Sequence, residues 1–169
     1  MAPLIQKENC QTKLDPMSSG QIELPATIIT LSEGETFALG KHLASLLGKG
    51  DVVALKGPLG AGKTCFTKGI ARGLGIEEEL TSPSYTIIAE YEGRVGNEKI
   101  PFYHIDAYRL DGNNDFSAIG GEELVFGNGI SVIEWSERIP DFIPSDAYTI
   151  DFGIIEDKKR SVKLSKQGR

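Results

Sequence analysis

The chain has 169 residues, of which 40% are hydrophobic and 25% charged, a composition typical of one soluble globular domain. Its formal net charge of −6 argues against a protein that grips nucleic acid with its own surface, but not against nucleotide binding. Two cysteines are too few for a disulfide scaffold. No apolar run approaches the roughly 20 residues of a membrane span, and the first residues lack the apolar core of a secretory signal peptide. We therefore expect a cytoplasmic protein.

The chain begins with a polar stretch, residues 1–21, that contains proline, serine and glycine. This composition predicts a disordered N-terminal extension, and Met17 leaves a second possible start of the chain open. A single domain is expected over residues 22–169, because no second apolar segment of domain size follows. Residues 25–31 predict its first short strand.

A helix and a buried strand are expected next. Ser32 and Glu35 stand at the spacing of a capping box, which predicts that a helix begins there and ends before Gly48 and Gly50. Its apolar face consists of Leu39, Leu43, Leu46 and Leu47. Residues 51–56 carry an apolar run that predicts a strand buried on both faces.

The most informative segment, residues 57–64, is Gly-Pro-Leu-Gly-Ala-Gly-Lys-Thr and matches the phosphate-binding pattern G-x-x-x-x-G-K-[ST]. In such a P-loop, glycines let successive N–H groups point at phosphate oxygens, Lys63 reaches the β- and γ-phosphates, and the Thr64 hydroxyl ligates Mg²⁺. A helix with an apolar repeat every four residues follows and is expected to stop at Gly75. This order of strand, loop and helix favours a nucleotide site over an ordinary glycine-rich turn. The residues expected to contact nucleotide are Leu59, Gly60, Ala61, Gly62, Lys63, Thr64 and Cys65.

Residues 81–86, Thr-Ser-Pro-Ser-Tyr-Thr, are similar to a switch segment, in which hydroxyl groups sense the γ-phosphate and its metal. The plainer alternative is a turn before a strand. The residues that would take part in a switch are Thr81, Ser82, Ser84, Tyr85 and Thr86. Residues 87–91 and 100–105 predict a hairpin around a turn at 92–99, so the sheet is expected to be mixed.

The remaining elements complete an α/β fold. Residues 116–126 predict one or two short helical turns, and residues 129–133 predict another apolar strand. Residues 148–154 and 161–164 predict a terminal hairpin. The expected fold class is therefore a P-loop nucleotide-binding fold with a mixed central sheet, flanking helices and antiparallel hairpins.

Two acids follow predicted strands and are the candidates for the magnesium side of the loop. Asp106 and Glu134 each end such a strand, and the carboxyl ends of parallel strands converge on the ligand crevice. Asp106 suits metal coordination, whereas Glu134 suits either metal binding or the activation of water. Either acid alone is equally well explained as a surface carboxylate. Trp135 fits a core anchor or a residue that shapes the site, and His104 fits a structural role.

Five segments occur in a characteristic order: Leu39-Gly40, residues 57–64, residues 81–86, His104-Ile105-Asp106-Ala107-Tyr108-Arg109-Leu110 and Val132-Ile133-Glu134-Trp135. Together they resemble the TsaE (YjeE) family, small bacterial ATPases of tRNA threonylcarbamoyladenosine synthesis. The resemblance spans about residues 24–164, and the last two segments carry its specificity because P-loops occur in many protein families. Cys65 and Ser136 depart from the family pattern, where threonine and proline are frequent.

The resemblance implies a function. Family members bind ATP and Mg²⁺, hydrolyse ATP slowly alone, and associate with TsaB and TsaD, the latter of which modifies adenosine 37 of tRNAs reading ANN codons. It implies that Lys63 and Thr64 bind phosphate and metal, and that Asp106 and Glu134 serve the magnesium and water side. It further ties Trp135 to activity and places Thr36 near adenine. Contact with tRNA is expected only through the complex.

Three other functions use the same P-loop. A small kinase usually has a lid that carries arginines over the phosphates. The arginines of this chain are scattered along the sequence, which disfavours a kinase. A GTP switch is disfavoured because the guanine-reading Asn-Lys-x-Asp segment is absent from the sequence. A non-catalytic nucleotide-binding adaptor shares every binding motif with an ATPase, so only turnover separates the two.

Overall fold

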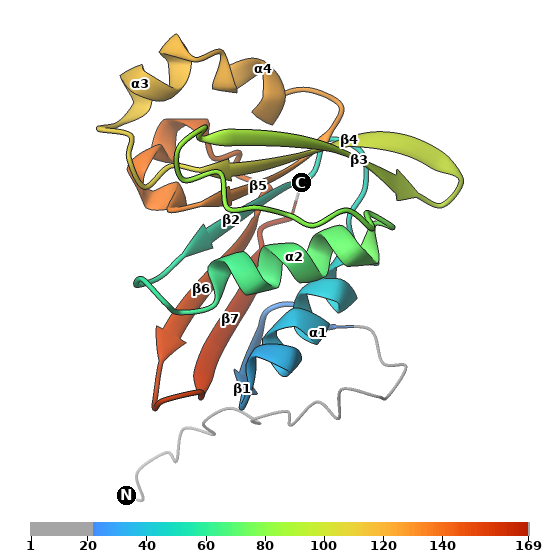
Figure 1. Ribbon diagram of the computed structural model, residues 1–169, viewed down its shortest axis with the longest axis vertical. Coiled ribbons are helices and arrows are strands. Elements are labelled where there is room, and N and C mark those ends of the chain that lie inside the picture. Colours follow the sequence, from blue (N-terminus) through green and yellow to red (C-terminus); the bar gives the residue numbers. More distant parts are fainter. Residues whose placement is uncertain (1–21, 169) are drawn as a thin grey trace, which may run out of the picture.

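The computed structural model describes residues 22–168, so the extension expected over residues 1–21 lies outside the described residues. A seven-stranded sheet forms the centre of the molecule (Figure 1). Its strands are β1 (Ala26–Thr30), β2 (Val52–Lys56), β3 (Ile88–Val95), β4 (Glu98–Asp106), β5 (Ile130–Glu134), β6 (Tyr148–Ile154) and β7 (Arg160–Lys166). The α-helices are α1 (Glu33–Ala44), α2 (Lys63–Gly73), α3 (Asn113–Ala118) and α4 (Gly121–Val125), and two 3₁₀ turns are η1 (Ser136–Arg138) and η2 (Pro140–Phe142).

The strand order is β1-β7-β6-β2-β5-β4-β3, which makes the sheet mixed, as predicted. β2 pairs in parallel with β5 and β6, and β5 pairs in parallel with β4. The outer pairs are antiparallel hairpins, β3 with β4 and β6 with β7, and β1 pairs antiparallel with β7. The carboxyl ends of β2, β4 and β5 therefore meet at one edge of the sheet.

The sheet has an apolar layer on each face. Because side chains alternate along a strand, Val132 packs in the cluster beneath α1 and α2, whereas Ile105 and Ile133 pack in the cluster on the other face. Figure 1 shows α1 and α2 side by side, with α3 and α4 well apart from them near β4. This alternation puts every second residue of β4 and β5 on the α2 side.

The helices α1 and α2 lie unusually close because glycines line their contact. A Cβ on Gly40 would clash with the carbonyl oxygen of Phe66, and one on Gly69 would clash with that of Phe37. A Cβ on Gly73 would clash with the Ala44 side chain and with the carbonyl oxygen of Lys41. The start of α2, where the P-loop ends, is therefore fixed against the start of α1.

Several element boundaries differ from the prediction. A turn was expected over residues 92–99, but β3 continues to Val95 and β4 begins at Glu98. The turn therefore consists only of the residues between them, which include Gly96. Gly96 has a φ of 59°, which suits the tight turn of a two-residue hairpin. The first helix ends at Ala44, before the glycines expected to stop it, where the Ser45 N–H donates to the carbonyl oxygens of the last turn.

Within residues 22–168, no helix is long and apolar enough to cross a membrane.

Candidate functional site

The P-loop has the backbone that its sequence predicts. Gly57 leaves β2 with a φ of 135°, and a Cβ there would lie 2.6 Å from the carbonyl oxygen of Phe152, so glycine is required. Gly62, with a φ of 103°, precedes α2, and no described side chain caps the helix there. The first amides of α2 and its positive end are therefore available to phosphate oxygens. The Leu59 side chain points outward and is 78% exposed.

Lys63 is held back within the loop. Its Nζ donates to the carbonyl oxygens of Gly57 at 2.6 Å and Pro58 at 2.9 Å, and lies 3.9 Å from the centre of the Trp135 ring. Burial lowers the pKa of Lys63, and nearby carboxylates, Glu134 foremost, partly oppose that shift. The ammonium group is thus bound to neutral carbonyl oxygens, in a position from which negatively charged phosphate oxygens can attract it.

Thr64 and Glu134 meet where the loop faces the sheet. The Thr64 hydroxyl donates to Glu134 Oε2 at 2.9 Å, which joins the first turn of α2 to the end of β5. The other carboxylate oxygen, Oε1, lies 2.7 Å from His104 Nε2 and 3.5 Å from the Thr67 hydroxyl. Glu134 is 3% exposed, so its carboxylate depends on these partners rather than on water.

Asp106 lies beside Glu134 on the neighbouring strand, because the two residues are paired in the register of β4 and β5. Its Oδ1 accepts the Tyr108 N–H at 3.0 Å, and its Oδ2 lies 3.5 Å from the Ser84 hydroxyl. The structure therefore brings both predicted acids to one edge of the sheet. Only Glu134 contacts Thr64, so the two acids occupy different places around the loop.

The segment of residues 81–86 reaches this edge through a strained backbone position. Ile87 has a φ of 67°, a left-handed conformation that is rare for a β-branched residue, and the sequence had placed it in the strand. Its N–H donates to the Pro83 carbonyl and its carbonyl accepts the Asp106 N–H. The segment is therefore fastened to the backbone of the Asp106 region.

The side chains of this segment mostly face outward. The Ser82 and Ser84 hydroxyl groups lie 2.8 Å apart, and only Ser84 approaches an acid. Tyr85 is 84% exposed, with the Arg109 guanidinium 4.4 Å from its ring centre. Thr81 and Thr86 are exposed.

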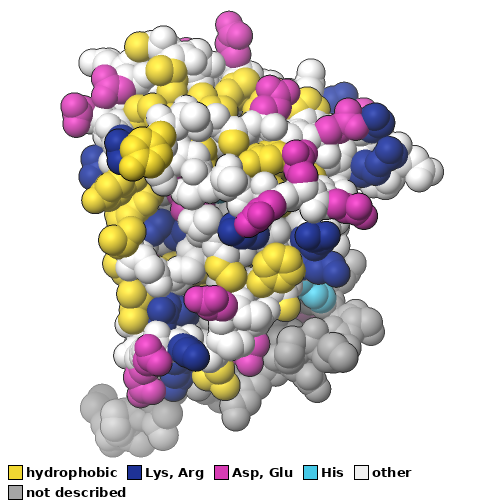
Figure 2. Space-filling model, in the orientation of Figure 1, with side chains coloured by type: hydrophobic (Ala, Val, Ile, Leu, Met, Phe, Trp, Pro, Cys, Tyr) yellow, Lys and Arg dark blue, Asp and Glu magenta, His cyan; other side chains and the backbone are white. Residues whose placement is uncertain are grey.

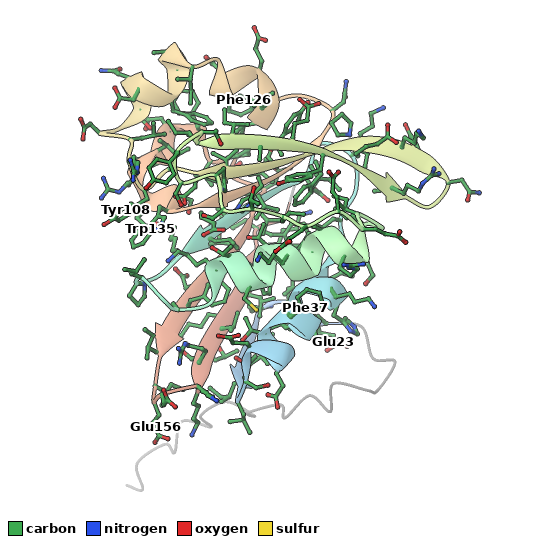
Figure 3. All side chains as sticks on the ribbon, in the orientation of Figure 1. Glu23, Phe37, Tyr108, Phe126, Trp135 and Glu156 are labelled. Atoms are coloured by element: carbon green, nitrogen blue, oxygen red, sulfur yellow. The ribbon has the colours of Figure 1, made fainter. Side chains whose placement is uncertain are left out.

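Trp135 is half-buried, packs against the apolar cluster that contains Ile105 and Ile133, and borders the P-loop. It has a left-handed backbone with a φ of 59°, and its ring contacts both the Lys63 ammonium and the Tyr108 ring, whose centre is 4.9 Å away. Figure 3 labels Trp135 and Tyr108 next to each other, and Figure 2 shows apolar side chains gathered down the same edge of the view. The Ser136 hydroxyl donates to the Leu55 carbonyl at 3.2 Å and so anchors the residue after Trp135 to β2.

Two further predicted contact residues border the loop. Thr36 is buried, with its hydroxyl 2.8 Å from that of Thr30, and its methyl group lies against Gly62. The Cys65 thiol donates to the Glu33 carbonyl at 3.2 Å, and burial raises the pKa of this thiol.

Sequence reasoning missed three contributors. His104 had been given a structural role, but the alternation of side chains along β4 places it on the same face as Asp106, and that two-residue spacing could have revealed it. Thr67 lies one helical turn after Lys63 and donates to the Lys63 carbonyl at 2.9 Å. Arg160 donates from Nη2 to the Gly60 carbonyl at 3.2 Å, which no local pattern signals.

The donor set of this edge suits magnesium shared with phosphate. Among residues 22–168, no group of three or more His, Cys, Asp or Glu side chains could hold a metal by itself. Thr64, Glu134 and Asp106 offer hard oxygen atoms, which Mg²⁺ prefers. Magnesium at P-loops takes a hydroxyl, one or two carboxylates, water and the phosphates themselves, so these residues fit the ion.

Comparisons with known proteins agree on one family. The model of the family described as "Threonylcarbamoyl adenosine biosynthesis protein TsaE" matches residues 30–162. The chain is 43% identical over 137 residues to the tRNA threonylcarbamoyladenosine biosynthesis protein TsaE of Treponema pallidum, covering 81% of this chain and 98% of that protein. It is 37% identical over 139 residues to TsaE of Bacillus subtilis, covering 82% and 84%.

A solved structure supports the fold. The crystal structure of YdiB from Bacillus subtilis superposes with a TM-score of 0.70 at 35% identity, covering 84% of this chain and 85% of that one. The α/β fold with its mixed sheet is thereby confirmed.

Proposed function

Because the chain belongs to the TsaE family of threonylcarbamoyl adenosine biosynthesis, we propose that it is the Mg²⁺-dependent, ATP-hydrolysing subunit of a tRNA-modifying assembly. In this proposal it works with TsaB and TsaD in the cytoplasm to form N6-threonylcarbamoyladenosine at position 37 of tRNAs reading ANN codons. The net charge of −6 supports contact with tRNA through the complex rather than directly.

The observation that carries the proposal is the contact between Thr64 and Glu134 directly behind the P-loop. A loop that only bound nucleotide would need the amides, Lys63 and a metal-binding hydroxyl. Here a buried carboxylate is also aimed at that hydroxyl, with a second acid on the next strand. Carboxylates beside the metal and the γ-phosphate are what hydrolysis requires to orient water.

The residues would divide the work as follows. The amides of residues 60–65 cradle the phosphates, and Lys63 exchanges the Gly57 and Pro58 carbonyls for phosphate oxygens. Thr64, with Asp106 and Glu134, would hold Mg²⁺, which neutralises charge on the phosphates when bound. Glu134 would also orient the water that attacks the γ-phosphorus as the bond to ADP breaks. Thr36, whose methyl group lies against Gly62, would take the place near adenine that the family resemblance implies.

The test is phosphate release from ATP by the purified protein, alone and with TsaB and TsaD. We expect slow release alone and faster release in the complex, with turnover reduced to a low residual rate in Lys63→Ala and Glu134→Ala. ATP binding without turnover in the complex would make the protein an adaptor. Transfer of the phosphoryl group to a second substrate would make it a kinase. A preference for GTP would overturn the assignment of adenine as the base.

A further inference from the structure

A buried polar contact lies beneath the proposed magnesium side. His104 in β4 is fully buried, and its Nε2 lies 2.7 Å from Oε1 of Glu134, which is also buried. An ionised carboxylate only accepts hydrogen bonds, so the imidazole donates through Nε2. This contact joins β4 to β5 on the side that faces α2.

The Glu134 carboxylate is held from two directions. Oε1 faces His104 on β4, whereas Oε2 accepts the Thr64 hydroxyl from α2. Rotation of the carboxylate would disturb both hydrogen bonds, so together they fix its plane. The nearest additional group is the Thr67 hydroxyl at 3.5 Å, which is already committed to the Lys63 carbonyl. His104 is therefore the main partner of Oε1.

Packing alone does not explain why a histidine stands at this position, because its other ring nitrogen is unsatisfied. Nδ1 of His104 is buried and has no hydrogen-bond partner among the described residues. A buried nitrogen without a partner is unfavourable, and an apolar ring would fill the same space without that cost. The one favourable polar interaction of the ring is with Glu134, which indicates that the contact is the reason for a histidine here.

We propose that His104 is a positioning residue that orients Glu134 for water activation and metal binding through the Nε2–H hydrogen bond. This inference rests on the proposed function of Glu134. Among the described residues, the polar partner of His104 is Glu134 rather than the P-loop, so its effect passes through Oε1. Removing the donor frees the carboxylate to rotate, so turnover falls while the P-loop amides still bind nucleotide.

The test compares two variants of the full chain in the complex with TsaB and TsaD. His104→Gln places an amide N–H near the position of Nε2, whereas His104→Phe keeps a ring and removes the donor. We expect His104→Phe to lower kcat by about 10- to 100-fold with little change in the KM for ATP, and His104→Gln to recover most of the loss. His42→Gln, at a half-buried position of α1, is the control for changing a histidine.

Coupling to Glu134 separates positioning from packing. In a Glu134→Ala background, His104→Phe should lower kcat no further, because the two residues act as one unit. The inference is overturned if His104→Phe and His104→Gln lose turnover equally, or if the effect of His104→Phe is the same with and without Glu134.

A spectroscopic readout keeps the inference testable without turnover. The chain has two histidines, so ¹⁵N-histidine labelling gives a simple spectrum that His104→Gln assigns. We expect a protected Nε2–H proton signal that shifts in Glu134→Ala but not in His42→Gln. A wild-type protein without ATP turnover would reject the proposed function, whereas an Nε2–H signal indifferent to Glu134→Ala would reject the role of His104.

Discussion

At the scale of single residues, the contacts of Lys63 and of Thr64 are the ones that nucleotide binding would change. Lys63 lies between loop carbonyls and the Trp135 ring, and Thr64 bonds to Glu134. In the first contact an ammonium group is bound by neutral carbonyl oxygens and an aromatic ring, and in the second a carboxylate orients a hydroxyl group. Binding of a triphosphate and Mg²⁺ would replace partners in both, so each contact yields its own prediction.

Trp135 should report nucleotide binding by its fluorescence. It is the only tryptophan in the chain, and the Lys63 ammonium lies 3.9 Å from its ring centre. When phosphate draws Lys63 away, the cation–π contact is lost and the emission should change in a saturable way. A titration with ATP and Mg²⁺ checks this, and Trp135→Phe is the blank. Binding detected by calorimetry without any change in emission would show that Lys63 stays on the ring.

The Thr64 hydroxyl should set the magnesium requirement. We expect Thr64→Ala to raise the Mg²⁺ concentration for half-maximal turnover by about tenfold or more, because a ligand to the ion and the partner of Glu134 are both lost. Thr64→Ser keeps the hydroxyl and serves as the matched control. Equal magnesium dependence in Thr64→Ala and the wild type would exclude Thr64 as a ligand.

Single residues were unequally predictable from the sequence. Lys63 and Thr64 follow from the loop spacing, because the chemistry of phosphate binding is local. His104 looked structural, since a lone histidine in an apolar strand gives no sign of the partner that the neighbouring strand supplies. Arg160 reaches Gly60 across the fold, and contacts between residues so far apart in sequence leave no periodic signal.

At the scale of elements, two contacts fix the position of the P-loop, one through α2 and one through the start of β7. α2 is pressed against α1 through glycines, and β7 begins with Arg160, whose guanidinium bonds to the loop. The helices and most strands follow from capping, periodicity and glycine positions. The sequence pattern underestimated the β3–β4 hairpin, because its exposed, charged outer half carries no apolar alternation and is held by backbone pairing.

Gly69→Ala should destabilise the fold through the helix contact. A methyl group there clashes with the main chain of α1, which cannot move as a flexible side chain would, so we expect a loss of about 1–3 kcal/mol in the free energy of unfolding. Gly34→Ala is the control, since its nearest neighbour is the Ser32 Oγ at 3.8 Å. Chemical denaturation of both variants checks this, and equal stabilities would contradict the close packing.

Arg160→Ala should weaken ATP binding without unfolding the protein. The guanidinium of Arg160 bonds to carbonyls of the β6–β7 turn and to Gly60, so its loss frees one side of the P-loop. We expect affinity for ATP to fall about fivefold, equivalent to about 1 kcal/mol. Lys163→Ala removes the same charge from an exposed position of β7 and should bind like the wild type. Equal losses in both variants would point to overall charge instead.

At the scale of the whole molecule, the sheet order assembles the site. Parallel pairing of β4, β5 and β2 sets Asp106, Glu134 and the loop side by side at one edge. The sequence predicted that strand ends would converge, but not that β5 lies between β2 and β4, because pairing between distant strands depends on the complete core. That placement explains why Glu134, rather than Asp106, meets Thr64.

In the proposed function, this edge of the sheet forms one site that binds a triphosphate and Mg²⁺ together. The most direct measurement is a calorimetric titration with a non-hydrolysable ATP analogue, in Mg²⁺ and in chelator. We predict binding at least about tenfold tighter with Mg²⁺ in the wild type, and loss of most of that difference in Glu134→Gln. Equal affinities with and without Mg²⁺ in the wild-type protein would contradict the account.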